Sequence, residues 1–209
     1  MRVLIACESS GAVRDAFTRA GHDAISCDLL PSIVPGLHHQ GDALAFMRSQ
    51  KWDLIIAHPP CTYLTVAGMH WNQRATHKRG QDRDASGLTF GDRETLKALD
   101  FVRAFMEADC PRIAVENPVS VISTRIRKPD QTIQPWQFGH DASKRTCLWL
   151  KGLPLLRATN VLPLPPSGRW ANQTASGQNK LAPSPDRWRL RSATYTGIAD
   201  AMAAQWGAS

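Results

Sequence analysis

Cys61 stands in a sequence context that suits a nucleophile better than a packed core residue. It directly follows Pro59 and Pro60, which end a short apolar run at positions 54–57. Proline lacks an N–H and has a fixed φ angle, so two in succession stop the ladder of a strand and turn the chain outward. We therefore expect the thiol beyond the carboxyl end of a buried strand, where open α/β sheets bind ligands. Such a thiol could serve hydrolase, transferase or redox chemistry.

Other polar residues follow predicted strands at the same end. Glu116 comes after the apolar run 112–115, Asp28 closes a strand predicted over residues 22–28, and a Ser/Gly turn at 8–11 follows the first strand. In a parallel sheet these ends meet in one crevice. The amide groups of such a turn and an acid closing the second strand are typical of a nucleoside cofactor site. The turn lacks the G-x-G-x-x-G pattern.

The elements that position these residues alternate along the chain. The apolar periodicity predicts five strands and four helices; the long third helix is expected to begin near a cap at Asp92 and to end before Pro111. The predicted strands cover residues 2–7, 22–28, 54–57, 112–115 and 146–150, and the other helices cover 12–20, 41–47 and 198–206. This order predicts an α/β domain with a doubly wound, mostly parallel sheet.

Two segments interrupt this alternation. Residues 66–91 are predicted to be a basic loop, and residues 153–186, rich in proline and small polar residues, an irregular insertion. Residues 1–152, completed by 187–209, would then form the catalytic and cofactor-binding domain. Phosphate contacts are expected from Arg74, Lys78 and Arg79 in the loop, and from Arg187, Arg189 and Arg191. The last three alternate with period two, which places them on one face of a strand; a solvated edge strand is the alternative.

Composition narrows the class of protein. The 209 residues include 25 Lys and Arg against 18 Asp and Glu, a net charge of +7 that suits a polyanionic partner such as nucleic acid. The five cysteines are odd in number and include no C-x-x-C pair, which argues against a disulfide scaffold or a zinc site and for a reducing cytosol. No apolar run approaches the length of a membrane span. We expect a cytoplasmic protein without a metal.

The paired motifs resemble those of a known enzyme family. Pro59-Pro60-Cys61 after one strand, followed by Glu116-Asn117-Pro118 after a later one, are similar to the catalytic motifs of DNA cytosine-5 methyltransferases. The order of the chain is similar to that of compact, phage-type members over about residues 1–152 and 187–206. The resemblance implies a Rossmann-like fold that uses S-adenosylmethionine, a minimal target-recognition insertion at 153–186, a monomer that acts on DNA, and, if phage-encoded, the bacterial host cytoplasm.

The resemblance also implies roles for individual residues. Cys61 would add to C6 of a flipped-out cytosine, and Glu116 would contact N3 and the exocyclic amine. Lys144 and Arg145 stand where the family has a basic substrate-binding motif, and the sequence leaves open which of them takes that role. The implied cofactor site consists of Cys7, Glu8, Ser9, Ser10, Gly11, Asp28, Leu29, Asp42, Pro59 and Pro60.

The chain departs from the family pattern in ways that leave alternatives open. His58 stands where the family often has Gly, and Thr62 where Gln is frequent. RNA is an alternative substrate, since both the chemistry and the charge permit it. A non-catalytic, cofactor-binding nucleic-acid module is another alternative. An amino-methyltransferase also uses a Pro-Pro motif, but His58 and Cys61 replace the polar residue and the aromatic residue that normally flank it.

Overall fold

One mixed sheet of seven strands organises the chain. The computed structural model describes residues 1–177, 179–185 and 187–208. In spatial order the strands run β3-β2-β1-β4-β5-β7-β6. All neighbouring pairs from β3 to β5 are parallel, whereas β7 runs antiparallel to both β5 and β6. The strands are β1 (Arg2–Ala6), β2 (Asp23–Asp28), β3 (His38–Gln40), β4 (Leu54–Ala57), β5 (Ile113–Pro118), β6 (Gln131–Ile133) and β7 (Thr146–Lys151).

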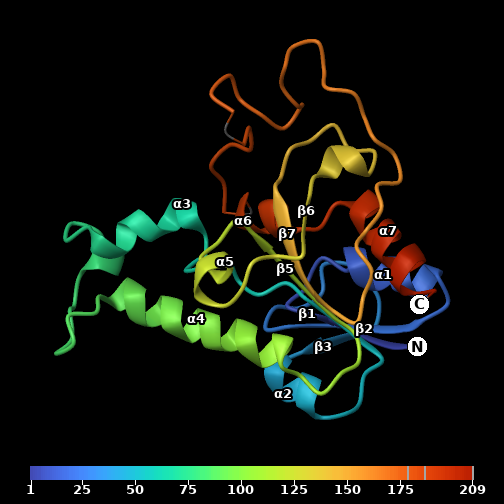
Figure 1. The fold of residues 1–209 in the computed structure, drawn as a ribbon, viewed down its shortest axis with the longest axis horizontal. Coiled ribbons are helices and arrows are strands. Elements are labelled where there is room, and N and C mark those ends of the chain that lie inside the picture. The colour runs from blue at the N-terminus through green and yellow to red at the C-terminus, as the bar shows by residue number, and fades with distance from the viewer. Residues whose placement is uncertain (178, 186, 209) are drawn as a thin grey trace.

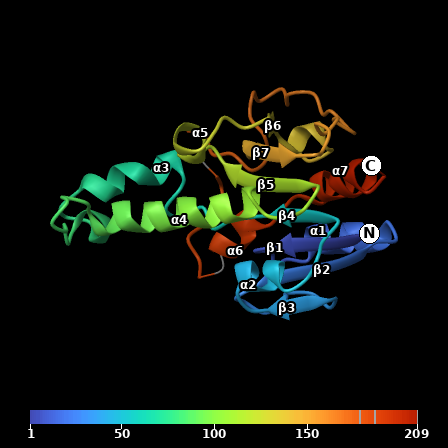
Figure 2. The same cartoon turned by 60° about the horizontal axis from the view of Figure 1, so that its bottom comes forward.

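Helices cover both faces of the sheet (Figures 1 and 2). One core lies between the sheet and helices α1 and α7, and includes Val3, Ile5 and Trp206. The other lies under α2, α4 and α5, and includes Leu4, Ile55 and Phe105. The helices are α1 (Ala12–Arg19), α2 (Ala43–Arg48), α3 (Val66–Met69), α4 (Phe90–Met106), α5 (Ile122–Arg125), α6 (Arg187–Ser192) and α7 (Thr196–Trp206).

This arrangement confirms the predicted fold class. Successive residues of a strand point to opposite faces, so a strand with helices on both sides is apolar throughout. All four residues of β4 are buried for this reason. The sheet order reverses between β1 and β4, which makes their carboxyl ends the point where open α/β sheets place their ligands. The doubly wound, mostly parallel sheet with its antiparallel β7 has a Rossmann-like topology.

The structure corrects the prediction for residues 66–91. They contain α3 and the 3-10 helices η1 (His70–Gln73) and η2 (Lys78–Gly80) in place of a continuous loop. Together with the start of α4 they form an arm that extends away from the sheet (Figure 2). The start of α4 also differs from the prediction: Thr89 is the N-cap, and Asp92 completes a capping box with it.

Three further differences concern the ends of the chain and the sheet edges. Residues 187–192 form the helix α6 instead of an edge strand. In a helix, Arg187 and Arg189 lie about 200° apart, so Arg189 points away from the face that Arg187 and Arg191 share. β3 and β6, each three residues long, were not predicted, and a third 3-10 helix, η3 (Pro135–Gln137), follows β6. No helix in the described residues is long and apolar enough to span a membrane.

Candidate active site

The loop after β4 carries Cys61 and is fixed by its backbone. The N–H of His58 donates to the carbonyl of Ala6 on β1 (2.9 Å), and the carbonyl of Cys61 accepts from the N–H groups of Leu64 and Thr65 (both 3.0 Å). From β5, the side-chain amide of Asn117 donates to the carbonyl of Pro59 (2.8 Å). The loop after β4 is therefore held to both neighbouring strands, and the half-buried thiol of Cys61 stands at the predicted edge.

Glu116 lies next to this loop because β4 and β5 are adjacent and parallel. Its carboxylate oxygen Oε2 is 3.0 Å from Nδ1 of His58. Burial alone would raise the pKa of Glu116, but the hydrogen bond and charge of His58, the charge of Lys144 and the hydroxyl of Thr146 outweigh it and lower this pKa. The structure thus favours an ionised carboxylate at this position.

Three charged side chains lie near enough to Cys61 to affect the pKa of its thiol. Burial, and then the negative charge of Glu116, raise the pKa of its thiol. The backbone N–H of Cys61 and the positive charges of Lys144 and Arg191 act in the opposite direction. Cys61, Glu116, Lys144 and Arg191, which come from four separate parts of the chain, are therefore close enough to influence one ionisation.

Lys144 and Arg145 have different surroundings. Nζ of Lys144 donates to the carbonyls of Ser192 (3.3 Å) and Ala193 (3.2 Å) at the end of α6, so its charge is held near Glu116. Lys144 also lines a small pocket with Glu116, Thr146, Thr194, Tyr195 and Ile198. Arg145 is exposed and lines no part of this pocket. Of the two, Lys144 faces the site.

Side chains of the turn after β1 accept hydrogen bonds from the N–H groups at the start of α1. Glu8 is buried and accepts hydrogen bonds from the N–H groups of Val13 (2.8 Å) and Arg14 (3.2 Å) at the start of α1. The hydroxyl of Ser10 accepts from the N–H of Ala12 (3.3 Å). By contrast, the amide groups of Ser9, Ser10 and Gly11 have no acceptor within the described part of the chain. An N–H group without an acceptor in the protein can bind an anionic group.

Arg14 connects this turn to the segment after β2. The sequence did not predict this role. Its guanidinium is buried and donates to the hydroxyls of Ser26 (3.2 Å) and Ser32 (3.0 Å) and to the carbonyl of Pro35 (2.9 Å). Gly11 has a φ of 75°, and a Cβ at this position would come within 2.5 Å of the guanidinium. Arg14 thus joins the first turn to the segment after β2, and glycine is required where the two approach.

Acidic residues lie around the same turn. The charges of Asp28 and Asp42 both act on Cys7, which has a φ of 59° and begins the turn, so all three residues are close together. Asp28 accepts from the N–H of Leu30 (2.9 Å), and Asp42 caps α2 through the N–H of Ala45 (2.7 Å). Leu29 is 73% exposed beside them. An exposed apolar side chain between acids and free amides suits a nucleoside with a charged substituent.

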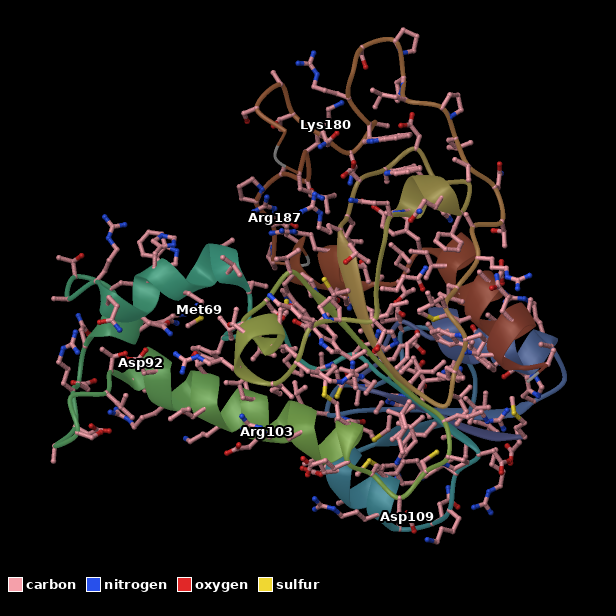
Figure 3. All side chains as sticks on the ribbon, viewed as in Figure 1. Met69, Asp92, Arg103, Asp109, Lys180 and Arg187 are labelled. Atoms are coloured by element: carbon pink, nitrogen blue, oxygen red, sulfur yellow. The ribbon has the colours of Figure 1, made fainter. Side chains whose placement is uncertain are left out.

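The predicted phosphate-binding residues fall into two groups. Arg74 and Lys78 are exposed on the arm, where the guanidinium of Arg74 lies 4.7 Å from the ring of Trp71. Arg79 is instead structural: it lies 4.6 Å from the ring of Tyr63 and donates to the carbonyl of Gly68. In Figure 3, Arg187 at the start of α6 is drawn between Lys180 of the insertion and Met69 of the arm.

A separate cavity of about 270 Å³ lies at the other end of β5. It is lined by Met106, Ile113, Arg127, Trp149, Leu150 and Lys151. Ile113 is the first residue of β5, whereas Glu116 lies near the carboxyl end of the same strand. The cavity is therefore apart from the group around Cys61.

No protein-family model matches the chain, and no curated protein matches it. A solved structure of a prophage-encoded E. coli protein, described as a DNA modification methyltransferase, overlaps 78% of this chain and 52% of its own at 14% identity and a TM-score of 0.48. A DNMT2 mutant from Spodoptera frugiperda overlaps 82% of this chain and 57% of its own at 17% identity and a TM-score of 0.38. The chain spans about half the length of both.

Proposed function

We propose that the protein is an S-adenosylmethionine-dependent DNA cytosine-5 methyltransferase. The observation that carries this proposal is the pairing of Cys61 and Glu116 at the carboxyl ends of adjacent parallel strands, on the same sheet edge as the turn after β1. The thiol of Cys61 would act at C6 of the cytosine ring, and the carboxylate of Glu116 would act at N3 and the exocyclic amine.

Methyl transfer to C5 of cytosine needs a nucleophile at C6 and a polar group at N3, and the thiol and the carboxylate would supply these. C5 of cytosine is a weak nucleophile, and addition of a thiolate at C6 makes it reactive. Cys61 would supply that thiolate, and Glu116 would contact N3 and the exocyclic amine, where charge changes during the addition. Lys144 would stabilise both groups from the side of β7. Because C6 is shielded in a stacked duplex, the base must be unpaired or turned out of the helix.

The turn after β1 fits the cofactor. The free amides of Ser9, Ser10 and Gly11 would hold the carboxylate of the methionine part, Asp28 would accept from the ribose hydroxyls, and Leu29 would pack on the adenine. Cys7, Asp42, Pro59 and Pro60 would complete the wall of the site. Glu8 would hold the turn in place by capping the start of α1. S-adenosylmethionine, when bound, supplies an activated methyl group.

Transfer of a labelled methyl group to nucleic acid tests the proposal. Wild type should label cytosine-containing DNA and Cys61→Ala should not, while Cys110→Ala, which changes a buried thiol between β4 and β5, should keep the activity. Labelling of RNA in place of DNA would reassign the substrate. Binding of S-adenosylmethionine and DNA without transfer to either nucleic acid would favour a non-catalytic module and contradict the proposal.

A further inference from the structure

The contact between His58 and Glu116 is more buried than an ion pair on the protein surface. Their side chains are 11% and 10% exposed, and Nδ1 of His58 lies 3.0 Å from Oε2 of Glu116. The other ring nitrogen, Nε2, is buried and has no partner among the described residues. A histidine with a purely structural role normally satisfies both nitrogens when it is buried. In His58, only Nδ1 has a partner among the described residues, and that partner is Glu116.

Each element around Glu116 contributes a defined group. His58 approaches from the end of β4, Thr146 from β7, Lys144 from the segment before β7, and Tyr195 from the start of α7. Cys61 lies on the loop after β4, with Arg191 of α6 near it. Of these groups, His58 is an ionisable side chain in direct hydrogen-bond contact with the carboxylate, at 3.0 Å. It is therefore placed to decide whether Glu116 has access to a proton.

The proposed reaction requires such a proton. When the thiolate adds to C6, the C5=C6 electron pair moves to C4=C5 and the C4=N3 pair moves to N3, which must then be protonated. A carboxylate whose pKa is lowered does not itself carry that proton. Nδ1 of His58 is one hydrogen bond away from it. Imidazole both gives and takes a proton readily under physiological conditions.

We propose that His58 is a positioning residue that holds a proton on Nδ1 and passes it through Glu116 to N3 of the target base. The inference rests on the proposed function and adds a residue to it. As the S–C6 bond forms, the Nδ1 proton of the His58 imidazolium moves to Glu116, and Glu116 passes a proton to N3. His58 is left as the neutral ring, with its other proton on Nε2. C5 then gains the methyl group and loses its proton to solvent, the S–C6 bond breaks, and the proton on N3 returns to His58.

Carbon-13 titration of the Glu116 carboxyl group tests the coupling without any substrate. The chain has four glutamates, Glu8, Glu94, Glu107 and Glu116, so Glu116→Gln identifies the signal. In His58→Asn an amide near the position of Nδ1 keeps a donor but carries no charge. The pKa of Glu116 should rise in this variant, and also in His58→Gln if the first does not fold. His22→Asn, at the opposite end of the sheet, should match wild type. An unchanged titration in His58→Asn would overturn the proposal.

The dependence of methyl transfer on pH tests the use of that proton. His58→Asn should slow single-turnover transfer to DNA by about a hundredfold, with little change in DNA affinity, and should remove one ionisation from the wild-type profile. Parallel profiles for the two proteins would overturn the relay and leave His58 with a structural role. If wild type transfers no methyl group to DNA or RNA, the proposed function and the relay both fail. A shifted Glu116 titration would then show that the pair is coupled for another purpose.

Discussion

The turn after β1 and the loop after β4 lie on the same sheet edge but use their polar groups in opposite ways. In the turn, the side chains of Glu8 and Ser10 accept hydrogen bonds from the start of α1, and three backbone amides have no acceptor among the described residues. In the loop, the N–H of His58 and the carbonyls of Pro59 and Cys61 are hydrogen-bonded within the protein, and the reactive polar group is the half-buried thiol of Cys61. The comparison suggests that the turn binds through its backbone and that the loop reacts through its side chains.

The largest expected effect is on activity, from a change in the loop after β4. Cys61→Ala should reduce methyl transfer at least about a thousandfold, because the nucleophile is lost. Its free energy of unfolding should change by less than about 1 kcal/mol, since the thiol is only half-buried. Radiolabel incorporation and urea denaturation measure the two quantities. A folded variant with wild-type activity would remove Cys61 from the mechanism.

A change in the turn after β1 should instead lower stability. Glu8→Ala leaves the N–H groups of Val13 and Arg14 buried without an acceptor, which we expect to cost about 2–4 kcal/mol of unfolding free energy. Urea denaturation measures this loss, with the exposed Glu107→Ala as the control. If Glu8→Ala unfolds like wild type but no longer binds S-adenosylmethionine, the turn uses its side chain for the ligand, and the contrast with the loop breaks down.

Lys144 and Arg145 are adjacent in sequence but should differ in effect. Lys144→Met removes a charge beside Glu116 and Cys61, and we expect a loss of about ten- to a hundredfold in methyl transfer. Arg145→Met removes an exposed charge and should change the rate by less than about threefold. Steady-state kinetics of both variants decide between the two residues. The reverse ranking would show that the base approaches from the other face.

The reactivity of the Cys61 thiol should depend on Glu116. The negative carboxylate raises the pKa of the thiol, so Glu116→Gln should lower this pKa. The pH midpoint of alkylation by iodoacetamide should then move down, and the rate at neutral pH should rise. Cys61→Ser provides the background from the other four cysteines. A midpoint unchanged in Glu116→Gln would mean that the two groups do not share one electrostatic environment.

The smallest effects are expected on the arm. Arg74→Ala or Lys78→Ala should each reduce the slope of log affinity for DNA against log salt concentration by about 0.9, if each contacts one phosphate. Arg79→Ala should leave the slope unchanged and loosen the arm, because its guanidinium stacks on Tyr63. Fluorescence anisotropy at several salt concentrations measures the slopes. Equal slopes for all three variants and wild type would exclude the arm from DNA binding.

The main sheet and its polar edge could be predicted because they depend on local signals. The apolar run that ends at Pro59 and Pro60 marks β4, and the run ending at Glu116 marks β5. The arm could not be predicted, since its short helices depend on contacts between distant residues, such as Asn72 with Thr95 and Arg79 with Tyr63. In α6, six residues are too few to separate a period of two from a helical one.

Within the site, the sequence indicated which residues lie near the edge but not which contact each other. Glu8 was expected in the cofactor site, and the sequence held no sign that its carboxylate turns towards the start of α1. His58 was noticed as an unusual residue before Pro59, yet its partner is 58 positions away on the next strand. Such contacts follow from strand order and register, which a single sequence does not specify.

Covalent trapping tests the central claim most directly. DNA containing 5-fluorocytosine, incubated with the protein and S-adenosylmethionine, blocks the loss of the C5 substituent and should leave the base joined to Cys61 through an S–C6 bond. We predict an adduct of protein and DNA that resists denaturation, maps to the peptide containing Cys61 by mass spectrometry, and is absent in Cys61→Ala. No adduct with DNA or RNA, or an equal adduct in Cys61→Ala, would contradict the account.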